Sequence, residues 1–170
     1  MLQLSAMLIN RPVMSLRTGT QVAVTLAPII NPNNLKIEGF YCQDAQRKRL
    51  VLVEQDIRDV LPQGLVVNDA DVLAEPDELV RLKNTMEIHF ELIGKAVVTT
   101  SREKLGKVSD YATETQSMMI KKLYVSRSIF KSFGTGSLGV DRTQIVEITP
   151  TKVVIQDLEG KVPAAAGAVA

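Results

Sequence analysis

The chain has 170 residues, of which 45% are hydrophobic and 23% are charged, and its formal net charge is +1. This balance is typical of a water-soluble globular protein, and it excludes a disordered chain and a strongly basic nucleic-acid domain. A single cysteine, Cys42, excludes an internal disulfide, and a single histidine, His89, excludes a zinc site of cysteines and histidines. Without 18 consecutive apolar residues or a cationic N-terminal segment, we expect a cytoplasmic protein with no membrane span, metal or cofactor.

Residues 1–75 have the pattern of a small all-β domain. Short apolar runs rich in strand-forming residues are separated by residues that favour turns. Residues 31–34 read as a turn before a strand from Leu35 to Cys42, and Gln63 with Gly64 turns the chain into the next strand. We call this segment copy 1.

Residues 76–90 have a different period and predict a linker helix. Pro76 and the acidic residues beside it are typical of a helix start. Leu79, Leu82, Met86 and Phe90 follow at spacings of three and four, which places them on one face. An amphipathic helix of this kind would pack on one or both flanking domains and fix their orientation.

Residues 91–158, which we call copy 2, repeat copy 1. The segment 56–69 aligns without a gap on 144–157, at an offset of 88, and upstream matches have offsets of 84 and 83. Val66 and Val154 fall at the same place in this alignment, so we expect them to be equivalent buried strand positions. A repeat of this length indicates two copies of one small domain. The remaining residues, 159–170, form an alanine-rich tail that we expect to be disordered.

A change of phase occurs at the same place in both copies. Ile37 and Phe40 cannot lie on one face of a regular strand, because their spacing is odd, and the same holds for Ile120 and Leu123. A change of phase within a strand is typical of a β-bulge or a sharp bend. Since it recurs, we predict a strongly bent or closed sheet in each copy.

Copy 2 resembles the PRC-barrel family. The resemblance rests on Leu92-Ile93-Gly94-Lys95, on Leu105-Gly106-Lys107-Val108 after a turn, on the strand from Ile120 to Val125, and on the closing segment 141–148. Copy 1 departs most at residues 20–23, where the Leu-Gly-Lys-Val signature is lost. The resemblance implies an all-β fold of two small PRC-type β-barrels, joined by the short amphipathic linker helix.

The resemblance also implies a function without catalysis. In the photosynthetic reaction-centre H subunit and in a ribosome maturation factor, the barrel contacts other macromolecules and carries no active site. We therefore expect a cytoplasmic adaptor whose partner is a protein, with homo-oligomerisation possible. The alternative is an RNA-processing or ribosome-assembly accessory factor that uses copy 2 to hold RNA or a ribosomal component.

Charge points to copy 2 as the binding copy. It holds ten basic and seven acidic side chains, whereas copy 1 holds seven basic and eight acidic ones. The candidate partner-binding residues are Lys121, Lys122, Arg127 and Lys131. Their basic groups can attract phosphates or an acidic protein surface, although a solvated barrel face would have the same pattern. Tyr124 is expected in the core, which weakens the case for stacking on RNA.

Three other motifs do not indicate an enzyme. Residues 134–139 match G-x-G-x-x-G, but barrel sequence follows where a dinucleotide site needs a helix. His89 has no serine or cysteine motif to serve as a base. Cys42 occupies the strand position that Val125 has in copy 2, which favours a small buried hydrophobe. We expect no catalytic residues.

Overall fold

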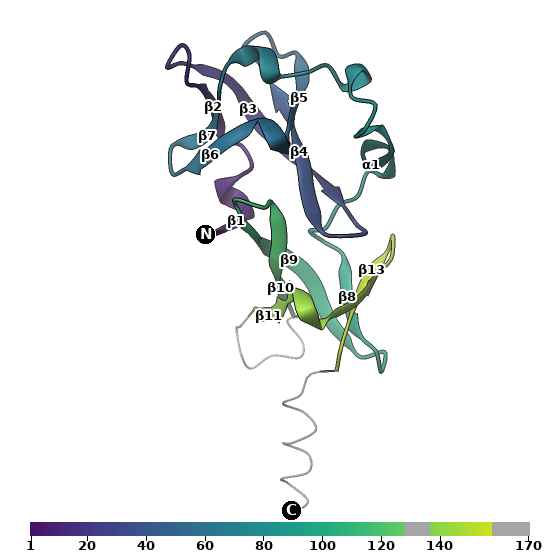
Figure 1. Ribbon diagram of the computed structural model, residues 1–170. Helices are drawn as coiled ribbons and strands as arrows, with labels where there is room; N and C mark the ends of the chain where they lie inside the picture. The colour runs from purple at the N-terminus through teal and green to yellow at the C-terminus, as the bar shows by residue number, and fades with distance from the viewer. Residues whose placement is uncertain (128–136, 158–170) are drawn as a thin grey trace, which may run out of the picture.

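A computed structural model describes residues 1–127 and 137–157 (Figure 1). Lys131 and the predicted tail, residues 159–170, lie outside the described residues. The strands of copy 1 are β2 (Pro12–Ser15), β3 (Gln21–Asn31), β4 (Lys36–Gln43), β5 (Arg49–Val53), β6 (Ile57–Leu61) and β7 (Gly64–Val67). Those of copy 2 are β8 (Ala96–Thr99), β9 (Lys104–Glu114), β10 (Met119–Ser126), β11 (Leu138–Asp141), β12 (Ile145–Ile148) and β13 (Lys152–Ile155).

The remaining elements are short. They are the strand β1 (Leu2–Leu4), the helix α1 (Lys83–Ile88) and the 3-10 turns η1 (Ser5–Met7), η2 (Glu54–Asp56), η3 (Ala70–Val72), η4 (Pro76–Glu78) and η6 (Arg142–Gln144). Strands therefore dominate the described chain, and the all-β class is confirmed.

The two copies have the same strand order. Neighbouring strands follow β6-β7-β2-β3-β4-β5 in copy 1 and β12-β13-β8-β9-β10-β11 in copy 2. In each copy the last strand pairs parallel to the first, β7 with β2 and β13 with β8. The edge strands β5 and β6 are joined by η2 without pairing in the described ladder, and η6 joins β11 and β12 likewise. Each copy is therefore an open sheet rather than a closed barrel.

Four bulges occur at equivalent places in the two copies. In each case one residue has no opposite partner in the ladder between two strands that are otherwise in register. The unpaired residues, each with its counterpart in copy 2, are Val22 and Leu105, Leu26 and Ser109, Glu38 and Lys121, and Arg58 and Val146. The bulges at Glu38 and Lys121 lie where the apolar pattern changes phase, so the β-bulge indicated by that change is confirmed.

Val66 and Val154 are equivalent in the ladder but differ in burial. Each pairs with the parallel strand at the same place, yet Val66 is 9% exposed and Val154 is half-buried. The fully buried residues of β13 are Val153 and Ile155. Because successive side chains point to opposite faces of a strand, these flanking residues face the core, and the expectation of a buried Val154 is wrong.

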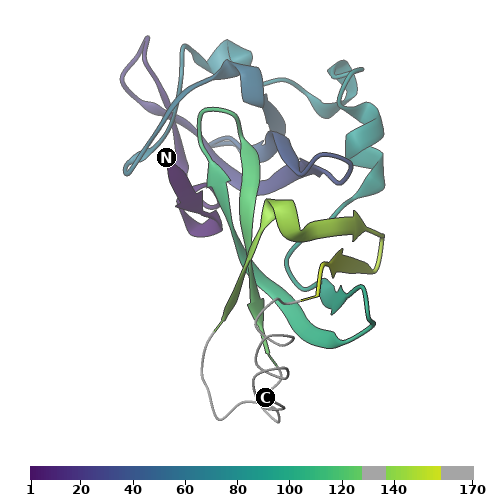
Figure 2. The ribbon, with the colours of Figure 1, turned by 60° about the horizontal axis from the view of Figure 1, so that its bottom comes forward.

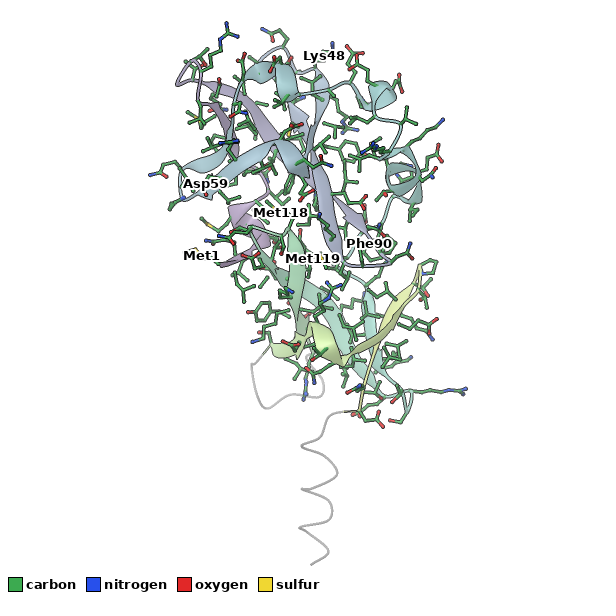
Figure 3. The ribbon with its side chains drawn as sticks, viewed as in Figure 1. Met1, Lys48, Asp59, Phe90, Met118 and Met119 are labelled. Carbon is green, nitrogen blue, oxygen red and sulfur yellow. The ribbon has the colours of Figure 1, made fainter. Side chains whose placement is uncertain are left out.

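The copies meet at the turns that precede β4 and β10 (Figure 1). The amide of Ile37 donates to the carbonyl of Met118 at 2.8 Å, and the amide of Ile120 donates to the carbonyl of Leu35 at 2.9 Å. Leu35 and Met118 are equivalent in the repeat, as are Ile37 and Ile120, so the contact is reciprocal. It joins all the strands into one 13-stranded sheet of the described residues. Figure 3 shows Met118 and Met119 where the copies meet.

The segment that precedes the six strands of each copy contacts the other copy. β1 pairs antiparallel with β9 of copy 2, with Gln3 opposite Thr113. The equivalent segment before copy 2 is α1, which contacts β3 of copy 1. Figure 2 shows the β9–β10 hairpin extending from copy 2 to copy 1. The pairing of β1 was not predicted, and the division into separate domains at residues 75 and 91 stays a prediction.

The linker contains less helix than its spacing predicts. α1 covers only residues 83–88, because Leu79 leaves the helical region with φ −98° and ψ 80° and His89 ends the helix with a φ of 50°. Leu79, Leu82 and Met86 nevertheless lie on the same side of the linker, toward copy 1. They pack with Ile29 and Val51 of copy 1, as an amphipathic segment should.

One apolar cluster runs through both copies. Its largest fully buried side chains come from the two halves of the chain: Tyr111, Phe40, Leu8, Ile37, Leu52, Leu65, Leu92, Met118, Ile120, Leu123, Ile155 and Val13. Phe90 packs at its margin, beside the junction between the copies (Figure 3). The cluster makes burial in one copy depend on the other.

Leu8 and Leu92 offer a matched test of this core. They are equivalent in the repeat and are 0% and 1% exposed. We predict that Leu8→Ala and Leu92→Ala each lower the free energy of unfolding by about 2–5 kcal/mol, because each leaves a cavity. Leu16→Ala is the control, since Leu16 is 62% exposed and should change stability by less than about 0.5 kcal/mol. Denaturant unfolding measures all three, and a loss below about 1 kcal/mol at Leu8 or Leu92 would refute the core assignment.

Candidate partner-binding face

The outer face of copy 1 is apolar and covered. It is the side of β3, β4 and β5 that points away from the main cluster, and it carries Ile29, Glu38, Tyr41, Val51 and Val53. The linker lies on it through Leu79, Leu82 and Met86. The Thr85 hydroxyl donates to Oε2 of Glu38 at 2.8 Å. The face is therefore occupied within the chain.

The same face of copy 2 has different side chains. The repeat places Lys121 at the position of Glu38, Lys122 at that of Gly39, and Tyr124 at that of Tyr41. It places Gly139 and Asp141 where copy 1 has Val51 and Val53. We call these five copy 2 residues the basic face. Two predicted site residues, Lys121 and Lys122, thus lie together on a sheet surface.

The two lysines of the basic face differ in exposure. Lys121 stands on a bulge and is exposed, whereas Lys122 is half-buried. The Lys122 side chain lies across Gly139, since a β-carbon at Gly139 would be only 3.3 Å from its Cε. Glycine at this position therefore leaves room for the lysine stem, which the valine of copy 1 would not.

Asp141 belongs to the basic face but does not neutralise its two lysines. Its carboxylate accepts from the Thr143 amide at 3.0 Å and from the Thr143 hydroxyl at 2.8 Å, in a capping box with Gln144. These hydrogen bonds, followed by the charges of Lys122 and Lys121, lower the pKa of Asp141. Among the described residues, no acidic group lies within 4 Å of either ammonium group. The lysines can attract an anionic partner.

Tyr124 is on the surface rather than in the core. It is half-buried and belongs to neither apolar cluster of the described chain, so its predicted core position is wrong. Tyr111, in contrast, is 1% exposed, and burial raises its pKa. The alternation between buried Leu123 and Val125 could have indicated the outward direction of Tyr124.

Arg127 lies apart from the two lysines. At about 3.3 Å per residue, it is roughly 20 Å along the strand direction from Lys121. It borders a groove of about 570 Å³ together with Lys104 and Lys107. The equivalent positions of copy 1 hold Asp44, Gln21 and Val24. The predicted site residues therefore fall in two places, and Lys131 lies outside the described residues.

Other reactive or basic side chains of copy 1 are held by contacts within the fold. Burial raises the pKa of the Cys42 thiol to about 12, so the thiolate needed for reactivity does not form at neutral pH. Among the basic residues of copy 1, Lys48 pairs with Glu75, and the guanidinium of Arg49 at the start of β5 lies 5.6 Å from the centre of the Tyr41 ring.

The glycine motif leads to a strand. Its described part, residues 137–139, enters β11, and the next turn is the single 3-10 turn η6. Such a turn lacks the helix N-terminus that a dinucleotide pyrophosphate requires. Within residues 1–127 and 137–157, no cluster of three or more His, Cys, Asp or Glu residues could hold a metal ion.

No family model matches the chain, and no curated protein matches it significantly. The described residues contain no helix long and apolar enough to cross a membrane.

The pKa of Asp141 reports the effect of the two lysines of the basic face. We predict that the double variant Lys121→Glu/Lys122→Glu raises the pKa of Asp141, because it replaces two favourable charges by two repulsive ones. Carbon-13 NMR titration of the carboxyl group measures the change.

The control is Lys104→Glu/Lys107→Glu, which makes the same change of net charge at the groove. Lys107 pairs with Ser126, roughly 13 Å along β10 from Lys122, which exceeds the screening length of about 8 Å at physiological salt. The control variant should leave the pKa of Asp141 unchanged. Equal shifts in both variants would show that the lysines of the basic face have no local effect on Asp141.

Proposed function

We propose that this chain is a non-enzymatic cytoplasmic adaptor of two PRC-type barrel modules, which holds a macromolecular partner on the basic face of copy 2. The contrast between the copies carries the proposal. One sheet face is apolar and covered by the linker in copy 1, while its counterpart in copy 2 is rich in lysine and carries a half-buried tyrosine. An excess of positive charge on a sheet face can attract an anionic partner.

The PRC-type modules are supported by the shared topology. Each copy has six strands in one order, a parallel closing pair, and edge strands joined by a single 3-10 turn. Bulges at four repeated places bend the sheets, and such bends turn the corners of small barrels. This supports open, barrel-like modules whose outer faces are free to diverge.

A protein partner is favoured by the make-up of the face. Two lysines and one aspartate form a mixed charge pattern, and mixed patterns fix the register of protein partners. A tyrosine beside them adds apolar area of the kind enriched at protein interfaces. The face has the chemistry of a small interface with an acidic protein surface.

Tyr124 also favours the second candidate, an RNA-processing or ribosome-assembly accessory factor. Its half-buried ring lies on the same sheet face as Lys121 and Lys122, and bases can stack on such a ring while the lysines contact phosphates. The face offers a single tyrosine, which limits stacking to about one base. RNA is therefore the alternative rather than the leading partner.

The test uses the tagged full chain, purified from its own cells together with what it binds. Three forms are compared by quantitative mass spectrometry: the unmodified chain, Lys121→Glu/Lys122→Glu, and the control Lys104→Glu/Lys107→Glu. We predict a protein that is retained by the unmodified chain and the control and is lost from the face variant. Circular dichroism checks that all three fold; Lys104, Lys107 and Lys121 are exposed and Lys122 is half-buried.

Nuclease treatment separates the two candidates. A protein partner remains bound after nuclease, whereas one bridged by RNA is lost. Equal recovery of every protein by the face variant and the unmodified chain would refute the proposal that the basic face is the binding surface.

A further inference from the structure

The chain shows how this sheet face is occupied in one of its copies. In copy 1 a short amphipathic segment, residues 79–86, lies on the outer face. Leu82 is 8% exposed there and packs with Ile29 and Val51. Leu79 and Met86 pack beside Tyr41. The segment is thus an example of a ligand for this face, held in place by the chain itself.

Each contact that residues 79–86 make with copy 1 can be compared with the equivalent position of copy 2. Tyr41 and Tyr124 are equivalent, so the apolar contact made by Met86 has a ready counterpart on copy 2. Thr85 donates a hydrogen bond to Glu38, but the equivalent residue is Lys121. A lysine is a donor only, so the group opposite it must be an acceptor and is best as a carboxylate.

Of the remaining charge differences, Lys122 for Gly39 adds a positive charge and Asp141 for Val53 a negative one, so Lys121 in place of Glu38 is what makes this face the more positive. Lys122 replaces a glycine, and Gly139 replaces Val51, against which Leu82 packs. The basic face therefore has less apolar area and more positive charge than its covered counterpart. A ligand for it needs fewer leucines and more acidic groups.

We infer that the basic face binds a short, acidic, amphipathic segment of a partner protein, laid on copy 2 as residues 79–86 lie on β3, β4 and β5 of copy 1. This inference rests on the proposed function and names the partner's binding element. The segment carries an apolar residue for Tyr124 and a carboxylate for Lys121. Its acidic groups keep it off copy 1, where Glu38 would repel it.

The probe is a synthetic peptide of residues 76–89 with Lys83→Glu and Thr85→Glu. A matched control peptide has Thr85→Lys and keeps Lys83, so both peptides have the same apolar residues. Binding of each labelled peptide to the full chain is measured by fluorescence anisotropy. We expect the acidic peptide to bind at least ten times more tightly than the control, and more weakly as salt rises.

The protein variants locate the binding. Lys121→Glu/Lys122→Glu should lower the affinity for the acidic peptide at least tenfold. Lys104→Glu/Lys107→Glu, which makes the same change of net charge, should lower that affinity less than twofold. Amide chemical shifts should change at Lys122, Tyr124 and Gly139 in the unmodified chain. Equal binding of the two peptides, equal loss in the two variants, or shifts centred on Tyr41 would overturn the inference.

A short oligouridylate RNA serves as the second probe. If it binds the basic face and the acidic peptide does not, the acidic peptide segment is refuted as the ligand while the proposed binding face stands. If a cellular partner is lost from the face variant but the acidic peptide still does not bind, the same conclusion holds. Failure of the proposed function itself is a different result, in which no cellular partner depends on Lys121 and Lys122.

Discussion

Two reciprocal hydrogen bonds between equivalent turns join the sheets of the two copies into one, and the β1–β9 pairing and the shared apolar cluster reinforce this junction. The two hydrogen bonds are the contacts of Ile37 with Met118 and of Ile120 with Leu35. Leu35 and Met118 have left-handed backbones, with φ of 52° and 56°, but are only 3% and 2% exposed. A non-glycine residue at positive φ costs about 1–3 kcal/mol, whereas truncating a buried leucine or methionine costs about 2–5 kcal/mol. Burial therefore outweighs the strain, and the side chains are retained.

This junction decides which faces are free. It brings the leading segment of each copy to the other copy, so that β1 pairs with β9 and α1 contacts β3. Because the linker must pass from copy 1 to copy 2, its apolar residues meet the outer face of copy 1 on the way. No described segment has that position over copy 2. One duplicated surface has thereby become a structural contact in one copy and a candidate binding surface in the other.

Much of this fold could be predicted from the sequence, because the repeat and the phase changes are local patterns. The offsets of 83 and 88 reappear in the strand ladders, and the predicted bends are bulges at Glu38 and Lys121. The pairing of β1 could not be predicted, since three residues without a turn signal find a partner more than a hundred positions later. The short α1 was also missed, because apolar spacing does not reveal a break in backbone angles at Leu79.

The candidate site could be predicted only in part. Charge counts selected copy 2 and the pair Lys121 and Lys122, which do share a face. Arg127 was grouped with them by proximity in sequence, yet an extended strand separates such residues by about 3.3 Å each. The expected core position of Tyr124 is wrong, because its alternation with buried Leu123 and Val125 points its side chain outward. For Tyr124, the residue type indicated the wrong location, whereas the two-residue period of the strand indicated the right one.

The central claim is that one sheet face is covered in copy 1 and open in copy 2, and the three tyrosines of the chain test it directly. Tyr41 and Tyr124 are its equivalent markers, and buried Tyr111 is the internal control. The measurement is the nitration rate of each tyrosine, in the unmodified chain and in Leu79→Ser/Leu82→Ser. The account predicts that Tyr124 reacts fastest and Tyr111 slowest, and that the linker variant accelerates Tyr41 alone. Protection of Tyr124 equal to that of Tyr111 would contradict it.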